Sequence, residues 1–256
     1  MDIIFKTKKF AKNFIWLNSV ESTNSFLKQN QENLQDKTVV ATLNQTKGRG
    51  TKNRKFLSVP SKTLAVSVLF KDLPLNLLNH LPKVFSISLI KCLNNFNVNS
   101  CKIKWFNDIT INEKKIAGIL CESSFFKKKI NCVVGVGINL LATEKELKSL
   151  NLLKAGSVFS ETKIQIKPED FLKNFIETLE LTHLNFLENC SEEKLIKLNN
   201  LFQKNCETIK KNVKVFSLSS KELFTAKAVG ISLNGNLLVK LNNKTYSLNC
   251  SKFSVL

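Results

Sequence analysis

The sequence predicts an α+β fold in which a mixed β-sheet with its helices is followed by a small β-barrel. Apolar, β-branched runs at residues 38–43, 63–70 and 130–138 have the composition of buried strands, and segments with helical spacing separate them. Near the C-terminus the pattern changes to short alternating runs divided by turns, which is typical of small barrels. We therefore expect a larger domain over residues 1–209 and a small one over residues 210–256.

The composition is that of a soluble globular protein, with 256 residues, 43% hydrophobic and 23% charged. No apolar run approaches the roughly 18 residues of a membrane span, so we expect no membrane insertion. The seven cysteines contain no C-x-x-C pair, which argues against a disulfide framework and a zinc site. Because the N-terminus also lacks a secretory signal, we expect a cytoplasmic protein.

The formal charge of +19 raises the question of nucleic-acid binding. The lysines are spread along the whole chain, and the richness in Lys, Asn, Ile and Phe is what an AT-biased coding sequence produces. We therefore expect no specific DNA binding. An acidic protein partner steered by this charge stays open.

The first strand is predicted at residues 14–17, and a helix follows it as far as about Asn30. The cluster Ser22, Thr23 and Asn24 offers the hydroxyls and the amide that are preferred at helix N-termini. A helix N-terminus also binds small polar ligand groups. Capping and ligand binding therefore both stay open for this cluster.

A basic loop with two glycines follows the strand predicted at residues 38–43. Gly48 and Gly50 let the backbone approach a ligand closely, and five cations lie within nine residues of the loop. Of the 39 Lys and Arg residues only Arg49 and Arg54 are arginines. Because a guanidinium fork suits phosphate and carboxylate, we interpret this segment as an anion-binding loop.

Helices are predicted at residues 82–97, 168–189 and 192–203 from the spacing of their apolar residues. The only two histidines lie outside the polar motifs. We expect His80 at the surface, and His183 either at the surface or packed against its helix's neighbours.

A second polar block bends at Asn107 and Asp108 and returns in a hairpin strand that begins at Lys115. Gly118 inside that strand marks a place where a ligand or another backbone comes close. We expect the ammonium of Lys115 over the same edge as Gly118. Asp108 is a candidate either for a Mg²⁺ ligand or for a lysine partner.

The strand predicted at residues 130–138 carries Gly135 and Gly137 and ends at Asn139. A dinucleotide-binding motif is disfavoured, because the third glycine is absent and no helix follows directly. Five of the eight glycines lie in the three polar motifs, as expected if these motifs line one ligand cleft.

Four motifs of this chain are similar, in order and approximate spacing, to those of biotin protein ligases: Gln45-x-x-Gly48-Arg49-Gly50, Lys104-Trp105-x-Asn107-Asp108, Lys115-x-x-Gly118-Ile119-Leu120-x-Glu122 and Gly135-x-Gly137-Ile138-Asn139. The triplet Ser22-Thr23-Asn24 also matches the helix start at which that family holds biotin. The chain departs from the family at Phe106, where a proline is usual. It departs again in the loop, where Thr51 and Asn53 replace a second arginine and a third glycine.

The resemblance implies a catalytic domain similar to class II aminoacyl-tRNA synthetases and biotin–lipoate ligases, followed by an SH3-like C-terminal barrel. It implies an ATP-dependent, AMP-forming ligase with biotin and Mg-ATP as substrates. A lysine of a biotin carboxyl carrier protein, such as that of acetyl-CoA carboxylase, would be modified through biotinyl-5'-adenylate. A carboxylate is already a nucleophile, so adenylation requires positioning and charge stabilisation rather than a histidine base.

The resemblance also implies roles for single residues. The biotin site would comprise Ser22, Thr23, Asn24 and Gln45. The acyl-phosphate would meet the loop at Gly48, Arg49, Gly50 and Thr51. The catalytic residues would be Lys115, Arg54 and Asp108, and Asp108 would be the candidate Mg²⁺ ligand. The remaining members of the site would be Asn107 near the triphosphate, Gly118 and Gly137 in the cleft wall, and Asn139 near the adenine.

Two other functions stay open. A lipoate–protein ligase would share the fold and the adenylation chemistry, although the loop and the Lys104-Trp105 motif favour biotin. A nucleic-acid-binding protein built on the lysine excess would show steep salt dependence without nucleotide chemistry. We expect the short form of the ligase, because a winged-helix domain does not fit before the first strand. A homodimer is compatible with the sequence.

Overall fold

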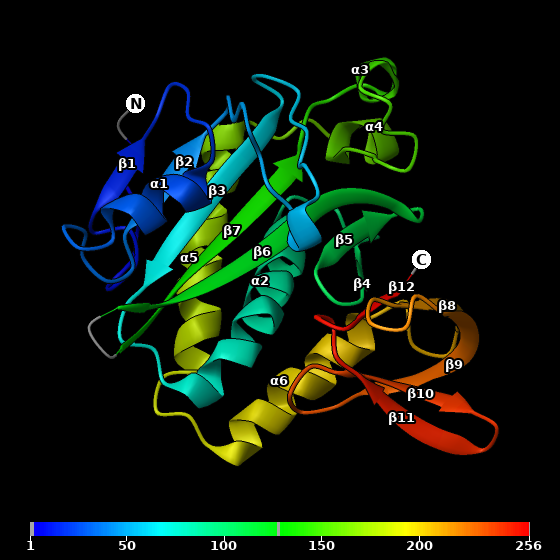
Figure 1. Ribbon diagram of the computed structural model, residues 1–256. Coiled ribbons are helices and arrows are strands. Elements are labelled where there is room, and N and C mark those ends of the chain that lie inside the picture. Colours follow the sequence, from blue (N-terminus) through cyan, green and yellow to red (C-terminus); the bar gives the residue numbers. More distant parts are fainter. Residues whose placement is uncertain (1–2, 127–128, 256) are drawn as a thin grey trace.

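The structure, a computed structural model, describes residues 3–126 and 129–255. A seven-stranded mixed sheet has the order β1-β2-β3-β7-β6-β5-β4, with β1 and β2 parallel and the other neighbours antiparallel (Figure 1). Its strands are β1 (Phe14–Trp16), β2 (Val39–Thr42), β3 (Thr63–Phe70), β4 (Lys102–Lys104), β5 (Asp108–Ile111), β6 (Lys114–Phe126) and β7 (Lys129–Asn139). The predicted α+β class and the predicted strands of this sheet are confirmed.

The centre of the sheet is formed by β3, β7 and β6. All residues of β3 are buried, as its continuous apolar sequence requires. Gly137 of β7 pairs with Ala65 on one side and with Gly118 on the other. Three small residues therefore lie side by side across three strands, which leaves room for a ligand on this part of the sheet.

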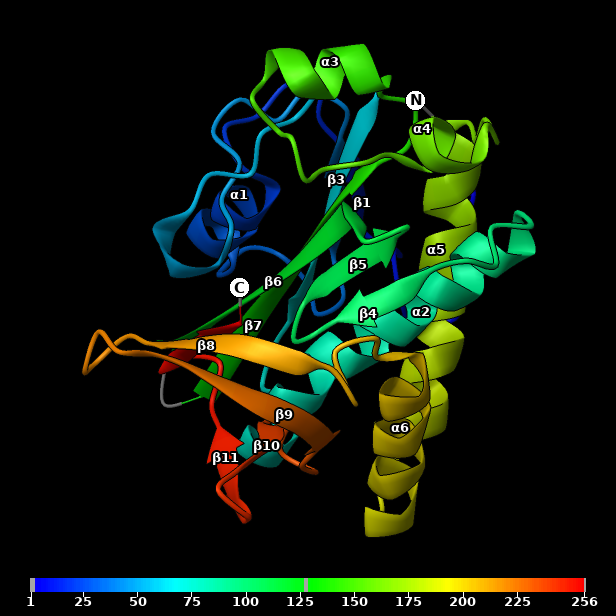
Figure 2. The same ribbon diagram turned by 90° about the vertical axis from the view of Figure 1, so that its right-hand side faces the viewer.

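Helices cover both faces of the sheet. Figures 1 and 2 show α1 (Thr23–Asn30) on one face and α2 (Leu81–Asn95) with α5 (Pro168–Phe186) on the other. Each of these helices follows its predicted position. The structure adds the short helices α3 (Glu144–Ser149) and α4 (Val158–Thr162) and the 3₁₀ turns η1 (Thr51–Asn53) and η2 (Leu75–His80), which the sequence did not predict.

The C-terminal segment forms a separate five-stranded antiparallel sheet in the order β11-β10-β9-β8-β12. Its strands are β8 (Asn212–Ser217), β9 (Leu223–Ile231), β10 (Leu237–Leu241), β11 (Lys244–Leu248) and β12 (Phe253–Val255), of which β12 was not predicted. The sheet lies beside α6 (Glu192–Asn205) (Figure 2). The indole Nε1 of Trp105 donates a hydrogen bond to the carbonyl of Gly235 at 3.0 Å, which ties the polar block of the large sheet to the small one.

The prediction of a surface position for His80 is wrong. His80 is only 2% exposed, because η2 turns its last residue inward at the start of α2. His183 is a packing residue, with its ring stacked on Phe70 and edge-on to Phe10. Burial lowers the pKa of each histidine to about 4, so both are neutral near pH 7.

Within the described parts of the chain, no helix combines the length and the apolar character that crossing a membrane requires.

Candidate functional site

A cavity of about 210 Å³ lies over the middle of the large sheet, between the start of α1 and the basic loop, by which we mean residues 46–55. Thirteen of the fifteen residues to which the resemblance assigns a role line it: Ser22, Thr23, Asn24, Gln45, Arg49, Gly50, Thr51, Arg54, Asn107, Asp108, Lys115, Gly118 and Gly137. Two others lie in adjoining hollows. Gly48 lines a groove of about 1070 Å³ along the basic loop, and Asn139 lines a hollow of about 110 Å³ that shares Lys115 with the main cavity.

The start of α1 forms one wall. Ser22 caps the helix by accepting a hydrogen bond from the backbone N–H of Ser25, so its capping role is observed. The backbone N–H and the hydroxyl of Thr23 both lie within hydrogen-bond distance of Gln45 Oε1, at 3.0 and 3.3 Å. The buried hydroxyl of Ser67, which the sequence analysis did not single out, lies 2.7 Å from Thr23 Oγ1. This wall is therefore a preformed polar surface.

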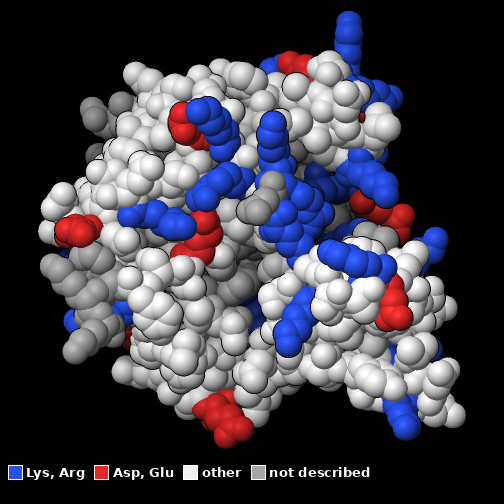
Figure 3. All heavy atoms as spheres, in the orientation of Figure 1, with Lys and Arg blue, Asp and Glu red and all other residues white. Residues whose placement is uncertain are grey.

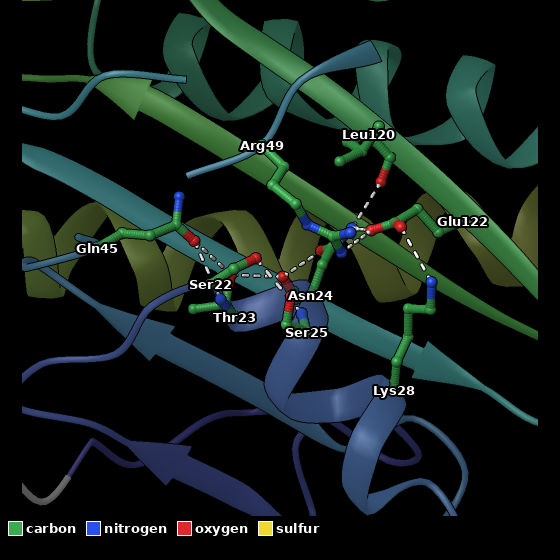
Figure 4. Close-up of polar contacts among 10 residues, drawn as sticks. Ser22, Thr23, Asn24, Ser25, Lys28, Gln45, Arg49, Leu120 and Glu122 are labelled. Carbon is green, nitrogen blue, oxygen red and sulfur yellow. Dashed lines mark hydrogen bonds and ion pairs between the residues drawn. The ribbon is translucent and has the colours of Figure 1, made fainter. Parts of the chain in front are cut away.

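The sequence analysis named Glu122 as part of a motif but assigned no role to its carboxylate. It accepts hydrogen bonds from Asn24 Nδ2 at 2.9 Å, Lys28 Nζ at 3.1 Å and Arg49 Nη2 at 2.7 Å (Figure 4). Burial acts to raise the pKa of Glu122, but these donors and the charge of Arg49 outweigh it and hold the pKa below its usual value. The carboxylate therefore stays ionised at neutral pH.

Asn24 is fixed at both ends of its amide. Its Nδ2 also donates to the carbonyl of Leu120 at 3.3 Å, and its Oδ1 lies 2.6 Å from the hydroxyl of Ser67. The same oxygen touches the backbone of Gly135, where any Cβ would overlap it. Glycine is thus required at position 135 because the Asn24 amide occupies the space of a Cβ, and not because the backbone turns there.

The basic loop closes on itself above the cavity. The N–H of Gly50 donates to the carbonyl of Arg54 at 2.7 Å, and the N–H of Phe56 donates to the carbonyl of Gly48 at 2.9 Å. The ring of Phe56 lies directly over Gly137, in space that a Cβ would occupy. Phe56 lines both the main cavity and the hollow next to Asn139, so its ring forms part of the wall between them.

Lys115 and Asp108 form an ion pair at the opposite wall. Lys115 Nζ lies 2.6 Å from Asp108 Oδ1 and 3.0 Å from the position of a Cβ on Gly118. Of the two alternatives for Asp108, the lysine partner is therefore observed. Asn107 stands beside the pair, with its Nδ2 donating to the carbonyl of Ile119 at 2.7 Å.

The side-chain amide of Asn139 is hydrogen-bonded within the protein interior. Its Oδ1 accepts from the hydroxyl of Thr63 and its Nδ2 donates to the carbonyl of Gly156, both at 3.0 Å. The side chain is thereby held between β3 and the segment before α4. It shapes the small hollow by its position.

Positive charge dominates the site. Figure 3 shows Lys and Arg side chains gathered at the centre of this face. Arg49, Arg54, Lys55 and Lys115 line the main cavity, and Asp108 is its one acidic residue among those that the structure describes. No histidine or cysteine lines this cavity in the described residues. Such a wall suits an anionic ligand that brings its own nucleophile and needs positioning and charge stabilisation.

The fold is that of the biotin protein ligases. Residues 16–139, just under half of the chain, match the biotin/lipoate A/B protein ligase family.

Known relatives agree with this assignment. The chain is 31% identical over 141 residues to biotin--protein ligase 1, chloroplastic, of Arabidopsis thaliana, an alignment that covers 52% of this chain and 38% of that protein. It is 40% identical over 72 residues to biotin--[acetyl-CoA-carboxylase] ligase of Paracoccus denitrificans, covering 27% of this chain and 30% of that protein. These matches therefore span only about a third of each relative.

The similarity in structure is more extensive. The biotin protein ligase from Aquifex aeolicus in complex with biotin and ATP superposes with a TM-score of 0.79 at 28% identity, and the match covers 96% of this chain and 99% of that one.

Proposed function

We propose that this protein is a biotin protein ligase, which joins biotin to a lysine of an acceptor protein at the expense of ATP. The observation that carries the proposal is the cavity itself. The cavity brings the neutral polar groups at the start of α1 together with three cations, Arg49 and Arg54 of the basic loop and Lys115 of β6. Biotin has a polar ring system and a carboxylate, and ATP is polyanionic, so the polar groups match biotin and the cations match the phosphates. The Aquifex aeolicus ligase of the same fold is described with both bound.

In the first half-reaction the biotin carboxylate attacks the α-phosphate of ATP and pyrophosphate leaves. Ser22, Thr23 and Gln45 hold the ring of biotin through the polar wall. In this proposal Lys115 stabilises charge on the α-phosphate, and its ion pair with Asp108 supports the role because it holds the ammonium before the substrates arrive. Arg49, Gly50 and Thr51 close over the acyl-phosphate, while Arg54 meets the phosphates.

In the second half-reaction the ε-amine of the acceptor lysine attacks the acyl carbon of the mixed anhydride, and AMP leaves. The groove of about 1070 Å³ lined by the basic loop is the approach that we propose for this amine. We propose a biotin carboxyl carrier protein, such as that of acetyl-CoA carboxylase, as the acceptor.

Magnesium would enter with ATP. The described residues hold no cluster of three or more His, Cys, Asp or Glu side chains suited to a metal ion. Mg²⁺ is commonly held by one or two carboxylates together with substrate phosphates. We propose that Asp108, which lines the cavity and pairs with Lys115 through Oδ1, would supply one such carboxylate to Mg-ATP, and the ion would neutralise phosphate charge.

The division into a catalytic domain over residues 1–209 and a C-terminal domain over residues 210–256 is also part of the proposal. The separate second sheet supports it. A cytoplasmic location is supported by the seven cysteines, all of which are free thiols.

The proposal is tested by biotin-dependent exchange of radioactive pyrophosphate into ATP with the purified chain. Exchange that needs biotin, and that lipoate neither replaces nor inhibits, is expected. Exchange driven better by lipoate would assign the protein to the other branch of the family. The absence of exchange with either acid would refute an adenylating enzyme.

A further inference from the structure

The carboxylate of Glu122 joins three segments that lie far apart in the chain. Asn24 and Lys28 come from α1, Glu122 from β6, and Arg49 from the basic loop (Figure 4). The two carboxylate oxygens of Glu122 have different partners. Oε2 accepts from Asn24 and Arg49, which face the cavity, and Oε1 accepts from Lys28. The glutamate side chain is only 18% exposed, so these bonds form in a partly desolvated place where they are strong.

The first consequence concerns the amide of Asn24. Its Nδ2 has a second acceptor in Leu120, but at 3.3 Å this is a longer bond than the 2.9 Å bond to Glu122. Its Oδ1 is pressed between Ser67 and Gly135. The carboxylate thus determines which end of the amide faces which wall, because only the NH₂ end can face an acceptor.

The second consequence concerns Arg49. Its side chain is 42% exposed and stands on a loop, and its one ion pair within the described residues is with Glu122. Without that contact a long side chain on a loop would sample many rotamers. Glu122 therefore sets the direction of the guanidinium at the rim of the cavity.

Charge balance leaves the cluster able to receive an anion. Arg49 and Lys28 carry two positive charges against the one negative charge of Glu122, which stays ionised because of its lowered pKa. A ligand anion can therefore bind the free side of the guanidinium without displacing the carboxylate. A guanidinium has five N–H donors, and the bond to Glu122 uses one of them.

We propose that Glu122 is a positioning residue of the ligase: it aims Arg49 at the acyl-phosphate and locks the Asn24 amide, while it does not itself line the main cavity in which biotin and ATP would bind. The proposal rests on the function proposed above. It predicts that loss of the carboxylate misplaces Arg49 by the order of an ångström, which in preorganised sites costs up to about 100-fold in rate.

The test measures biotin-dependent ATP–pyrophosphate exchange for Glu122→Gln, Arg49→Met and the double variant. Glu122→Gln is expected to lose about 10- to 100-fold. In the Arg49→Met background Glu122→Gln is expected to lower the exchange rate several-fold less, because the guanidinium that Glu122 positions is already absent. Glu122→Asp keeps the charge with a shorter reach and is expected to recover part of the activity. Lys28→Met is the matched control, since it removes the partner of Oε1 alone, and a loss below about three-fold is expected.

Thermal unfolding of each variant separates positioning from folding. Equal fold-losses from Glu122→Gln in both backgrounds, or full exchange by Glu122→Gln, would overturn the proposal. If Glu122→Gln does not fold, the same cycle is measured with Glu122→Asp and Arg49→Met. Additive losses of exchange rate in that double variant would likewise overturn the proposal. Failure of the proposed function shows itself separately, as the absence of exchange by the unaltered protein.

Discussion

The ammonium of Lys115 lies 2.6 Å from Asp108 and directly over Gly118, at the wall of the cavity that faces the basic loop. The two residues belong to adjacent antiparallel strands, β5 and β6. Since Gly118 has no side chain, nothing on the strand separates the ammonium from the ligand space. This geometry fixes a cation beside the cavity before any ligand binds.

Lys115→Ala should therefore slow biotin-dependent adenylation by roughly 10²–10³, about 3–4 kcal/mol, as for other preorganised charge stabilisers. The free energy of unfolding should change little, because the Lys115 side chain is 40% exposed. Pyrophosphate exchange and urea unfolding measure the two effects. The control is Lys114→Ala, whose ammonium pairs with Glu161 instead. A near-normal exchange rate in Lys115→Ala would remove this residue from the mechanism.

Much of the cavity was predictable because its parts are local. Glycines in strands and a basic loop after a strand are visible in the sequence, and strand pairing brings them together without further information. Gly137 and Gly118, for example, meet because β6 and β7 form a long hairpin with one register.

Glu122 was not predictable in the same way. Its contacts with Arg49 and Asn24 connect residues 73 and 98 positions apart, and depend on where α1 and the loop meet the sheet. The available signal was its place at the end of the motif that begins at Lys115, which gave no indication of its partners. His80 was misplaced because its burial follows from the turn η2, which the sequence pattern did not reveal.

The basic loop should act as a lid. Its first residues are tied to the segment before α1 by the backbone N–H groups of Thr46 and Lys47, which donate to the carbonyls of Val20 and Glu21. Beyond them its contacts with the rest of the molecule are made by side chains, chiefly Arg49 with Glu122 at 2.7 Å and Lys52 Nζ with the carbonyl of Phe253 at 2.8 Å. Contacts of this kind hold a loop loosely when its cations repel one another, and ligand phosphates should relieve that repulsion. We expect trypsin to cut within residues 46–55, and biotin with ATP to slow this cut at least several-fold.

Cleavage after Lys221, in an exposed turn of the C-terminal sheet, serves as the internal control. Its rate should not depend on the ligands. Equal protection at both places would indicate general stabilisation, and equal cleavage of the loop with and without ligands would refute the lid.

The buried histidines should make folding sensitive to mild acid. Burial lowers the pKa of His183 to about 4, whereas in the unfolded chain it is near 6.5. The unfolded state therefore binds the proton first, so the stability due to neutral His183 is present above about pH 6.5 and is lost as the pH falls toward 4. The slope approaches about 1.4 kcal/mol per pH unit for each such histidine.

His183→Phe keeps the aromatic packing on Phe70 and Phe10 and removes an Nδ1 that has no hydrogen-bond partner. Its unfolding free energy should fall less between pH 7.5 and pH 5.0 than that of the unaltered protein, by about 1–2 kcal/mol. Urea denaturation at the two pH values measures this difference. Because overpacking acts equally at both pH values, it cancels. An unchanged pH dependence would mean that His183 binds its proton equally well in the folded and unfolded states.

The last prediction concerns Thr51, which stands where the family usually has a second arginine. Thr51 lines the cavity, and its Oγ1 accepts a long hydrogen bond of 3.4 Å from Arg54. Its neighbour Lys52 does not take the place of the missing guanidinium. The backbone of Lys52 is left-handed, with φ of 59°, and its Nζ is held by the carbonyl of Phe253 and by Ser254 Oγ at 2.8 and 2.6 Å, on strand β12.

A charge-assisted hydrogen bond from a guanidinium contributes roughly 1.5–3 kcal/mol, and a neutral hydroxyl contributes less. We therefore expect biotinyl-adenylate to escape faster from this protein than from a Thr51→Arg variant, by roughly ten-fold for 1.4 kcal/mol. Escaped adenylate acylates lysines in solution. Incubation with biotin, ATP and an inert lysine-rich protein should thus label that bystander more strongly with the unaltered protein. Ser220→Arg, which adds the same charge on an exposed turn of the C-terminal sheet, should label like the unaltered protein. If Thr51→Arg also labels equally, backbone amides of the loop already retain the intermediate, and the departure at Thr51 has no cost.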